Sequence, residues 1–497
     1  MYDEYTITYS IPMSTEALEL DQGIRSPVLR FWDMQLGYAK MVTGALTRMN
    51  PFLDPNNIGV EMLKELQTKL QSYDAEENLR PANFSHGLSN GMNPYHVFLE
   101  SQKARKLFFE MALTQLKVIK SFFPVLPPLF QQVENFIRTN LAFTFTFNRP
   151  DWKLGIEPTR VESLDFADIL KFEAAPENKN GRNMLLIAPM SGHFATLLRK
   201  TVESLHQAGY TVYITDWKSP FNVEKSKGEF TVDRYTTEVL NAFRVVEKDG
   251  GTFDTLAVCQ PSPETLTATT YAETHKLPKP RSLTLMAGPI DVSKSPTAIN
   301  ETGEKLNPHV LESLKLTIPE GKKLGSGRSV YPAALQIMGF ISTKPDEHLA
   351  NYRKLAYKTS PLNEDERKML AFYEEYFAIM DLPHEFYEST VNRVFRGNEW
   401  ARGKVMYNGN EVRFSDMTTP LITVEGDRDD ICGIGQTEAA QNITNPRKSR
   451  HILVEGAGHY GTFAGKLFRE RYLGELDAFL GEIEAENRAK SRSRKKA

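Results

Sequence analysis

A cysteine directly after an apolar segment is the side chain in this sequence best placed for nucleophilic chemistry. Residues 255–259 read Thr-Leu-Ala-Val-Cys, and Gln260, Pro261 and a stretch rich in Glu and Thr follow. This order is typical of a nucleophile elbow, a sharp strand-to-helix turn that exposes one reactive side chain. The N–H groups and the positive dipole end of the helix that follows favour the thiolate of Cys259. The alternative is a buried core cysteine, because free cysteines are among the most buried residues.

An acidic loop follows a later apolar segment, residues 421–424, and it offers a partner for a catalytic histidine. In sheets that carry a nucleophile elbow, the acid of the triad stands in the loop after such a late strand. Asp429, three residues beyond Gly426, fits that loop best, and Asp427 and Asp430 are rivals. The alternative is an acidic loop that is merely solvated.

A histidine among three glycines comes after the last apolar segment of the chain. In Glu-Gly-Ala-Gly-His-Tyr-Gly-Thr, residues 455–462, His459 can approach a neighbouring loop closely, as a general base must. Alone it would be a surface histidine, but the order of nucleophile, acid and histidine is the one expected of this fold. The sequence therefore predicts that His459 takes the proton of Cys259 and that Asp429 orients the imidazole, which leads to a covalent acyl-enzyme.

The loop after the first clear strand predicts an oxyanion hole. It reads Ile-Ala-Pro-Met-Ser-Gly-His-Phe over residues 187–194. In elbow-bearing sheets this loop supplies one oxyanion N–H, and the residue after the nucleophile supplies the other. We expect the donors to be the N–H of Gln260 and that of Met190 or Ser191. His193, in the same loop, is a candidate substrate contact or merely a helix-start residue.

Short apolar segments that alternate with helical stretches predict the elements that position these side chains. Such segments are typical of strands buried on both faces of a parallel sheet. Strand–helix alternation predicts an α/β fold with a doubly wound, mostly parallel sheet. The expected strands are 184–188, 210–215, 255–258, 283–286, 421–424 and 451–454.

Five regions follow from the changes in pattern along the chain. One of them, residues 294–417, is a long insertion between two core strands. An insertion of this length is usually functional, so we interpret it as a lid or cap, with helices at 364–380 and 382–396. The N-terminal helices are expected at 28–42, 62–70 and 97–119; we expect them to pack on the main domain, with an exposed hydrophobic contact surface as the alternative. The regions are a mainly helical N-terminal region (1–148), the two parts of the α/β core (149–293 and 418–486), the inserted lid (294–417) and a basic, disordered tail (487–497).

Composition limits the classes of function. Of 497 residues, 40% are hydrophobic and 25% are charged, which is ordinary for a globular protein. A net charge of −3 argues against a nucleic-acid binder, and two cysteines exclude a disulfide framework and indicate a reducing compartment. No leader segment, membrane span or metal-ligand spacing is evident, so we expect a cytoplasmic protein without a metal or other cofactor.

The motifs together resemble those of intracellular poly(3-hydroxybutyrate) depolymerases. The likeness covers roughly residues 150 to 485. It implies an α/β-hydrolase fold, a Cys-Asp-His triad formed by Cys259, Asp429 and His459, and a polyhydroxyalkanoate granule as substrate and partner. The segments that carry the resemblance are 188–193, 258–261, 287–291, 294–298, 424–431 and 458–461.

Several alternatives stay open after this resemblance. Polyhydroxyalkanoate synthases also use a cysteine on this fold, but with a glycine-flanked elbow, and Ala257 and Pro261 in those places favour a depolymerase. Coenzyme A could replace water as the acyl acceptor. A third reading is a non-catalytic protein that binds polyester granules. The preferred monomer and the oligomeric state do not follow from the sequence.

Overall fold

The computed structural model describes most of the chain from residue 128 onward. The described residues are 102, 105–107, 109–114, 116–117 and 128–494, without 307–310, 313, 319–320 and 322. Helices predicted at 28–42 and 62–70 lie outside them. The chain divides into two compact units, which we describe separately. The first comprises Met1–Arg149, Glu312–Pro319 and Ala334–Ile379, and the second comprises Pro150–Leu311, Glu320–Ala333 and Met380–Ala497.

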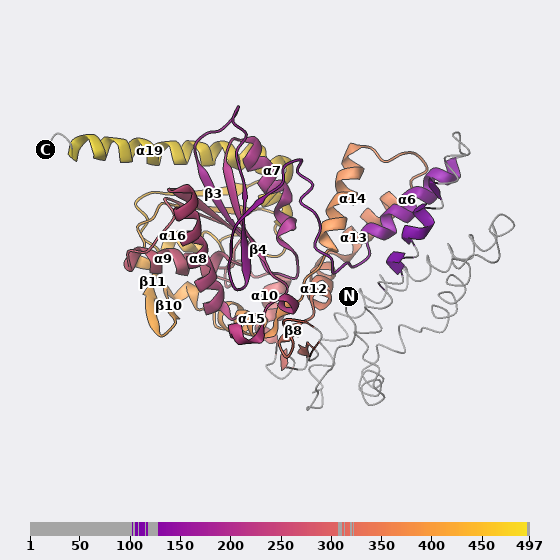
Figure 1. The fold of residues 1–497 in the computed structure, drawn as a ribbon, viewed down its shortest axis with the longest axis horizontal. Coiled ribbons are helices and arrows are strands. Elements are labelled where there is room, and N and C mark those ends of the chain that lie inside the picture. The colour runs from indigo at the N-terminus through magenta and orange to yellow at the C-terminus, as the bar shows by residue number, and fades with distance from the viewer. Residues whose placement is uncertain are drawn as a thin grey trace. The chain divides into compact units, whose positions relative to one another are not determined.

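An eight-stranded sheet forms the centre of the second unit (Figure 1). Its strand order is β1-β2-β4-β3-β5-β6-β12-β13. Only β2 runs against its neighbours, and every pair from β4 to β13 is parallel. The strands are β1 (Thr159–Ser163), β2 (Ala167–Phe172), β3 (Asn183–Ile187), β4 (Thr211–Trp217), β5 (Phe253–Val258), β6 (Leu283–Met286), β12 (Leu421–Gly426) and β13 (Ser449–Val454). This is the sheet of an α/β-hydrolase, and the predicted fold class is confirmed.

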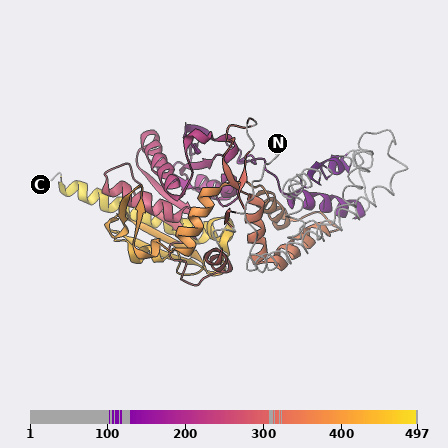
Figure 2. The ribbon, with the colours of Figure 1, turned by 90° about the horizontal axis from the view of Figure 1, so that it is seen from below.

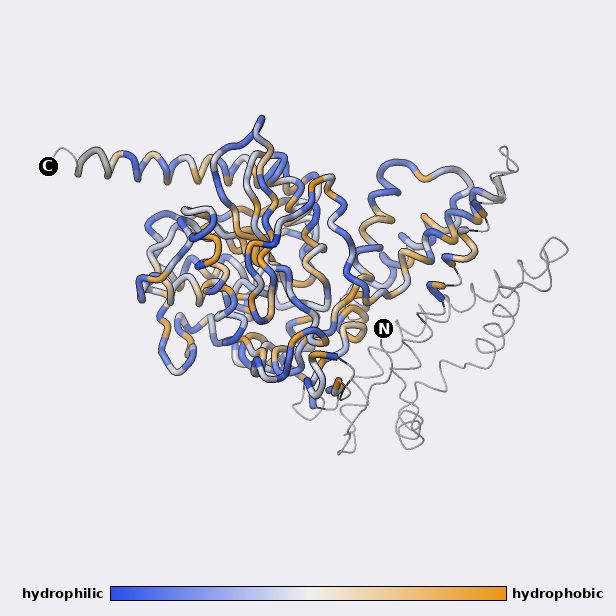
Figure 3. Tube along the Cα trace, in the orientation of Figure 1, coloured by the Kyte–Doolittle hydropathy of each residue, from blue (hydrophilic) through white to orange (hydrophobic). Residues whose placement is uncertain are grey.

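The six predicted strands are confirmed within a few residues, and all of them except β13, which is largely half-buried or exposed, are buried runs. Every residue of β5 and of β12 is buried, and hydrophobic residues gather along the central strands (Figure 3). Strands β1 and β2 were not predicted. Strand β1 lies at the edge of the sheet and is largely exposed, so it has no apolar run to detect.

Helices cover both faces of the sheet, with α8 and α9 side by side on one face and α7 on the other (Figure 1). Helix α8 begins where the Thr231 hydroxyl accepts the Arg234 N–H, and it buries one stripe that includes Tyr235, Val239 and Val246. The flanking helices are α7 (Arg199–Gln207), α8 (Val232–Gly250), α9 (Ser262–Thr274) and α19 (Gly474–Arg494).

The predicted lid, residues 294–417, separates β6 from β12 and is divided between the two units. It is mainly helical, as predicted, and it also contains short strands that were not predicted. Its function as a lid stays a prediction. Its elements are α10 (Ala298–Lys305), β7 (Leu316–Thr317), β8 (Ser329–Tyr331), α12 (Ala333–Thr343), α13 (Pro345–Ala356), α14 (Glu364–Tyr376), β9 (Leu382–Pro383), α15 (His384–Thr390), η5 (Val391–Arg396), η6 (Trp400–Arg402), β10 (Lys404–Tyr407), β11 (Asn410–Arg413) and η7 (Phe414–Asp416).

The middle of this insertion packs against the N-terminal region within the first unit. Helix α6 (Pro128–Ala142) contacts α13 and α14. The Asn135 amide donates a 2.9 Å hydrogen bond to the Lys358 carbonyl, and Phe143 stacks on Tyr373 with 3.9 Å between the ring centroids. The N-terminal region and the predicted lid therefore share a core, which their distance in the sequence concealed.

The C-terminal helix is longer than predicted. Leu476 and Phe479 are buried, and α19 continues to Arg494 and extends beyond the sheet in both views (Figure 1, Figure 2). Residues 487–494 are therefore helical rather than disordered, and 495–497 lie outside the described residues. None of the helices in the described ranges combines the length and the apolar character that a bilayer crossing needs.

Candidate active site

The turn between β5 and α9 has the geometry of a nucleophile elbow. Cys259 has φ of 64°, a left-handed conformation that is uncommon for any residue except glycine. Its N–H donates to the Met286 carbonyl at 2.7 Å, and its carbonyl accepts the Ser262 N–H at 3.1 Å. A Cβ atom at Gly288 would lie 2.0 Å from the Ser262 hydroxyl. The glycine that this turn needs therefore comes from the segment after β6 and not from the flanks of the cysteine.

The predicted acid and base are in direct contact. The Oδ2 atom of Asp429 lies 2.8 Å from Nδ1 of His459. The other oxygen of Asp429 accepts the N–H groups of Ile431 and Cys432, both at 2.8 Å. The Asp429 side chain is 0% exposed and that of His459 is 5% exposed. Water therefore competes little for this pair, and three hydrogen bonds fix the orientation of the carboxylate.

The surroundings of His459 determine which ring nitrogen can accept a proton. A carboxylate only accepts hydrogen bonds, so Nδ1 must donate to Asp429, and Nε2 is left to face another partner. Cys259 hydrogen-bonds the ring. Burial alone lowers the pKa of His459, but the Asp429 carboxylate and the Cys259 sulfur outweigh it and hold that pKa well above its usual range. The ring can therefore hold a proton while it contacts both the Asp429 carboxylate and Cys259.

The loop after β3 brings a backbone N–H next to the elbow. The Met190 N–H donates a 2.8 Å hydrogen bond to Oε1 of Gln260, the residue after the predicted nucleophile. The start of the loop is held at the Ala188 carbonyl, which accepts from Nε1 of Trp217 at 2.7 Å and from the Tyr235 hydroxyl at 2.6 Å. Two of the predicted oxyanion residues, Met190 and Gln260, therefore lie side by side.

The other predicted members of this loop lie in the same turn. Ser191 is half-buried, and His193 is 1% exposed. The Gly192 carbonyl accepts the Met380 N–H at 2.9 Å. The structure thus places His193 in the interior, and its predicted contact with substrate stays a prediction.

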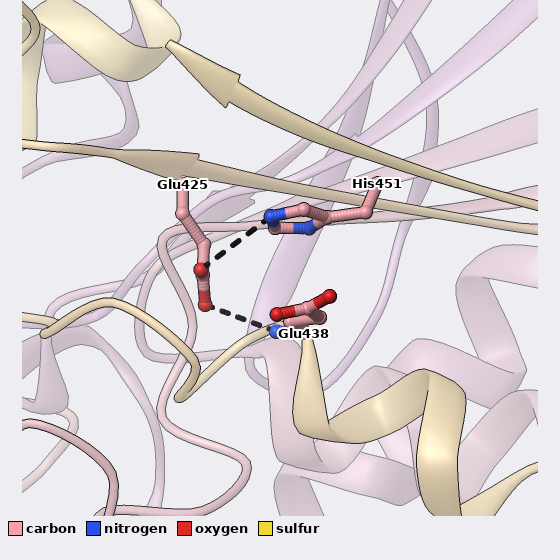
Figure 4. A group of neighbouring side chains, drawn as sticks. All are labelled: Glu425, Glu438 and His451. Carbon is pink, nitrogen blue, oxygen red and sulfur yellow. Dashed lines mark hydrogen bonds and ion pairs between the residues drawn. The ribbon is translucent and has the colours of Figure 1, made fainter. Parts of the chain in front are cut away.

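A cluster of Glu425, Glu438 and His451 lies beside the loop that carries the predicted acid (Figure 4). The carboxylate oxygens and the imidazole nitrogen that could bind a metal ion lie within 4.8 Å of one another. The Glu425 carboxylate accepts three backbone N–H groups, from Gly435 at 2.9 Å, Thr437 at 2.7 Å and Glu438 at 3.0 Å, and Nε2 of His451 is 3.8 Å away. Glu425, at the end of β12, therefore holds residues 435–438 against the sheet.

A buried carboxyl group in the first turn of α9 gives a testable pH dependence. Glu264 is fully buried, and neither carboxyl oxygen accepts a hydrogen bond from another residue in the described part of the chain. Burial raises its pKa to about 8, although its own N–H and Arg393 act in the opposite direction. The folded state therefore binds this proton more tightly than the unfolded state. The stabilisation is complete below about pH 4.5 and is lost as the pH rises towards 8.

We expect Glu264→Gln to remove this loss, because the amide stays neutral. Between pH 4.5 and 8 the free energy of unfolding of the wild type should fall, relative to the variant, by on the order of 4 kcal/mol. Urea denaturation at several pH values measures it. Glu273→Gln on the same helix is the control, because the pKa of Glu273 lies at about 2, outside this range. Parallel pH profiles for the wild type and Glu264→Gln would contradict the assignment.

The chain matches one known family over part of its length. Residues 287–484 match the family described as PHB de-polymerase C-terminus, where PHB denotes poly(3-hydroxybutyrate). The matched region contains Asp429 and His459, whereas Cys259 precedes it. The resemblance found in the motifs is thus confirmed for this region, and the match supports an ester-bond hydrolase.

Solved structures similar to this chain have low sequence identity to it. A putative lipase from Acinetobacter baumannii AYE is 14% identical with a TM-score of 0.37, and 67% of this chain and 94% of that chain are covered. A bromoperoxidase from Bacillus anthracis is 12% identical with a TM-score of 0.38, and 65% and 99% are covered. A membrane phospholipase A described as a bacterial virulence factor is 14% identical with a TM-score of 0.37, and 76% and 98% are covered. No curated protein matches the chain.

The triad candidates were predicted from the sequence, but several residues in the elements around them were not. Tyr235 and Glu264 lie within helices, where the pattern indicates only a buried face. Gly288 stands in an Ala-Gly-Pro sequence directly after a predicted strand, and that position was the available signal for a close approach. The contact of the Gln260 side chain has no sequence signal.

Proposed function

We propose, from the match of residues 287–484 to the PHB depolymerase C-terminus family, that this chain cleaves the ester bonds of poly(3-hydroxybutyrate) or a related polyhydroxyalkanoate. Cys259 is the nucleophile, His459 is the general base and Asp429 orients it. The protein acts in the cytoplasm at the surface of polymer granules, and it needs no metal or other cofactor.

One observation carries this proposal: the 2.8 Å hydrogen bond between Asp429 and His459, at the end of the sheet where Cys259 forms its strained turn. A strained backbone at a reactive side chain persists only where the surrounding structure imposes it. Here the strain points one sulfur towards an imidazole whose other nitrogen is already held. This arrangement supports acyl transfer through a covalent intermediate.

The first half of the reaction forms the acyl-enzyme. His459 Nε2 holds the proton of the Cys259 thiol, and the sulfur attacks the ester carbonyl carbon. The negative charge on the carbonyl oxygen is stabilised by the N–H groups of Gln260 and Met190. When the carbon–oxygen bond breaks, His459 returns the proton to the departing alkoxide. The products are an acyl thioester on Cys259 and a shortened chain that ends in a hydroxyl group.

The second half releases the acid. His459 Nε2 takes a proton from a water molecule, whose oxygen attacks the thioester, and the proton then returns to the sulfur. A thiol such as coenzyme A could attack in place of water and would leave with the acyl group as a thioester. The Cys259 chemistry is the same for both acceptors, so identification of the product decides between them.

The test is the product formed from amorphous poly(3-hydroxybutyrate) particles. We expect release of 3-hydroxybutyrate or its short oligomers in buffer alone, measured by chromatography, with rate and product unchanged by coenzyme A. A product that appears only as a coenzyme A thioester would replace hydrolysis by thiolysis. Growth of polymer from a hydroxyacyl thioester would favour the synthase-like reaction. Binding to the particles without any product would contradict an enzymatic role.

A further inference from the structure

The side chain of Gln260 occupies a hydrogen-bond donor, the Met190 N–H, that the proposed reaction needs. Its Oε1 accepts the Met190 N–H at 2.8 Å. Because a backbone N–H can only donate, the amide oxygen and not the amide nitrogen must face it. A carbonyl oxygen of the protein therefore stands where the carbonyl oxygen of a substrate would accept the same hydrogen bond.

Met190 has little freedom to find another acceptor. The residue is 1% exposed, and its loop is held at both ends, at the Ala188 carbonyl by Trp217 and Tyr235 and at the Gly192 carbonyl by the Met380 N–H. A buried N–H without a partner is costly, so Gln260 satisfies a group that would otherwise be unpaired in the free enzyme. Gln260 itself is half-buried, and its flexible side chain can turn towards water.

We infer that the Gln260 side chain closes the oxyanion hole of the free enzyme and that substrate must displace it. The inference rests on the proposed function, because it assigns the Met190 N–H to the oxyanion hole. An amide oxygen competes well with a neutral ester carbonyl but poorly with an oxyanion, whose charge-assisted hydrogen bonds are about twice as strong. Replacement of the Gln260 amide oxygen by the substrate oxygen is therefore more favourable in the transition state than in the bound ester. In this way Gln260 discriminates between the two.

Two substitutions of the same size separate closure from a packing role. Gln260→Met removes the amide oxygen, whereas Gln260→Glu replaces it with a carboxylate, a stronger acceptor. Both variants keep the backbone N–H of residue 260. The probe is a small trifluoromethyl ketone, which forms a hemithioketal with Cys259 and places its oxyanion in the hole. Its affinity is measured by inhibition and by ¹⁹F NMR of the adduct.

We expect the ketone to bind Gln260→Met about five- to thirty-fold more tightly than the wild type, and to bind Gln260→Glu more weakly. Alkylation of Cys259 by iodoacetamide does not use the oxyanion hole, and it is measured in all three proteins to show that the thiol stays accessible and reactive. Equal affinity in both variants, or a change in the same direction in both, would overturn the inference and leave the proposed function intact. Absence of any Cys259 adduct in all three proteins would overturn both.

Discussion

Replacing Cys259 with alanine is expected to lower the rate of ester hydrolysis by about 10⁶-fold, because no other group can form the acyl-enzyme. The methyl group of alanine fits the turn, and the hydrogen bonds of residue 259 to Met286 and Ser262 come from its backbone. The fold should therefore survive. Acid release from amorphous poly(3-hydroxybutyrate) measures the loss, and thermal unfolding checks that the variant is folded.

The second cysteine of the chain gives a matched control. Cys432 is buried, and its contact with Asp429 is made by its backbone N–H, which alanine retains. Burial raises the pKa of its thiol well above the usual range, which makes it a poor nucleophile. We expect Cys432→Ala to keep most of the activity. Equal activity of Cys259→Ala and the wild type would place the nucleophile elsewhere.

The second large effect is expected at Asp429. In Asp429→Asn, the amide oxygen can still accept the N–H groups of Ile431 and Cys432, so the amide nitrogen would face the His459 ring. Nδ1 must then accept, and the ring proton moves to Nε2, where it prevents the ring from taking the Cys259 proton. We expect a loss of about 10⁴-fold in kcat.

The rival acids of the same loop test this assignment. Asp427 accepts the Gly456 N–H at 2.7 Å and makes no contact with the His459 ring among the hydrogen bonds described. The isosteric changes Asp427→Asn and Asp430→Asn keep an acceptor oxygen in place, so kcat should stay close to that of the wild type. A greater loss in either of them than in Asp429→Asn would move the acid to that position.

The parts of the fold that the sequence reveals are those whose physical requirement is local. A strand buried on both faces needs an apolar run, so β5 and β12 are visible in the sequence. Edge strand β1 has no such requirement and was missed. The helical continuation of α19 to Arg494 was also missed, because basic composition alone does not distinguish a solvated helix from a disordered tail.

The site shows the same division between local and long-range requirements. The order of Cys259, Asp429 and His459 along the chain is local information, and the contact of Asp429 with His459 agrees with it. The space for the elbow is not local, because it is supplied by Gly288. The occupation of the Met190 N–H by Gln260 likewise joins two loops whose meeting depends on the whole sheet.

The strand order also governs how the chain is made on the ribosome. Strand β6 pairs with β12, yet the whole insertion is synthesised between them. Because residues are added at about 5–20 per second, the edge of β6 that pairs with β12 stays unpaired for roughly ten seconds. During that interval the nascent chain presents an apolar edge strand, which is a template for aggregation. The yield of correctly folded protein should therefore depend on the translation rate and on the supply of chaperones, even though the sheet has no such unpaired edge at β6 once it is complete.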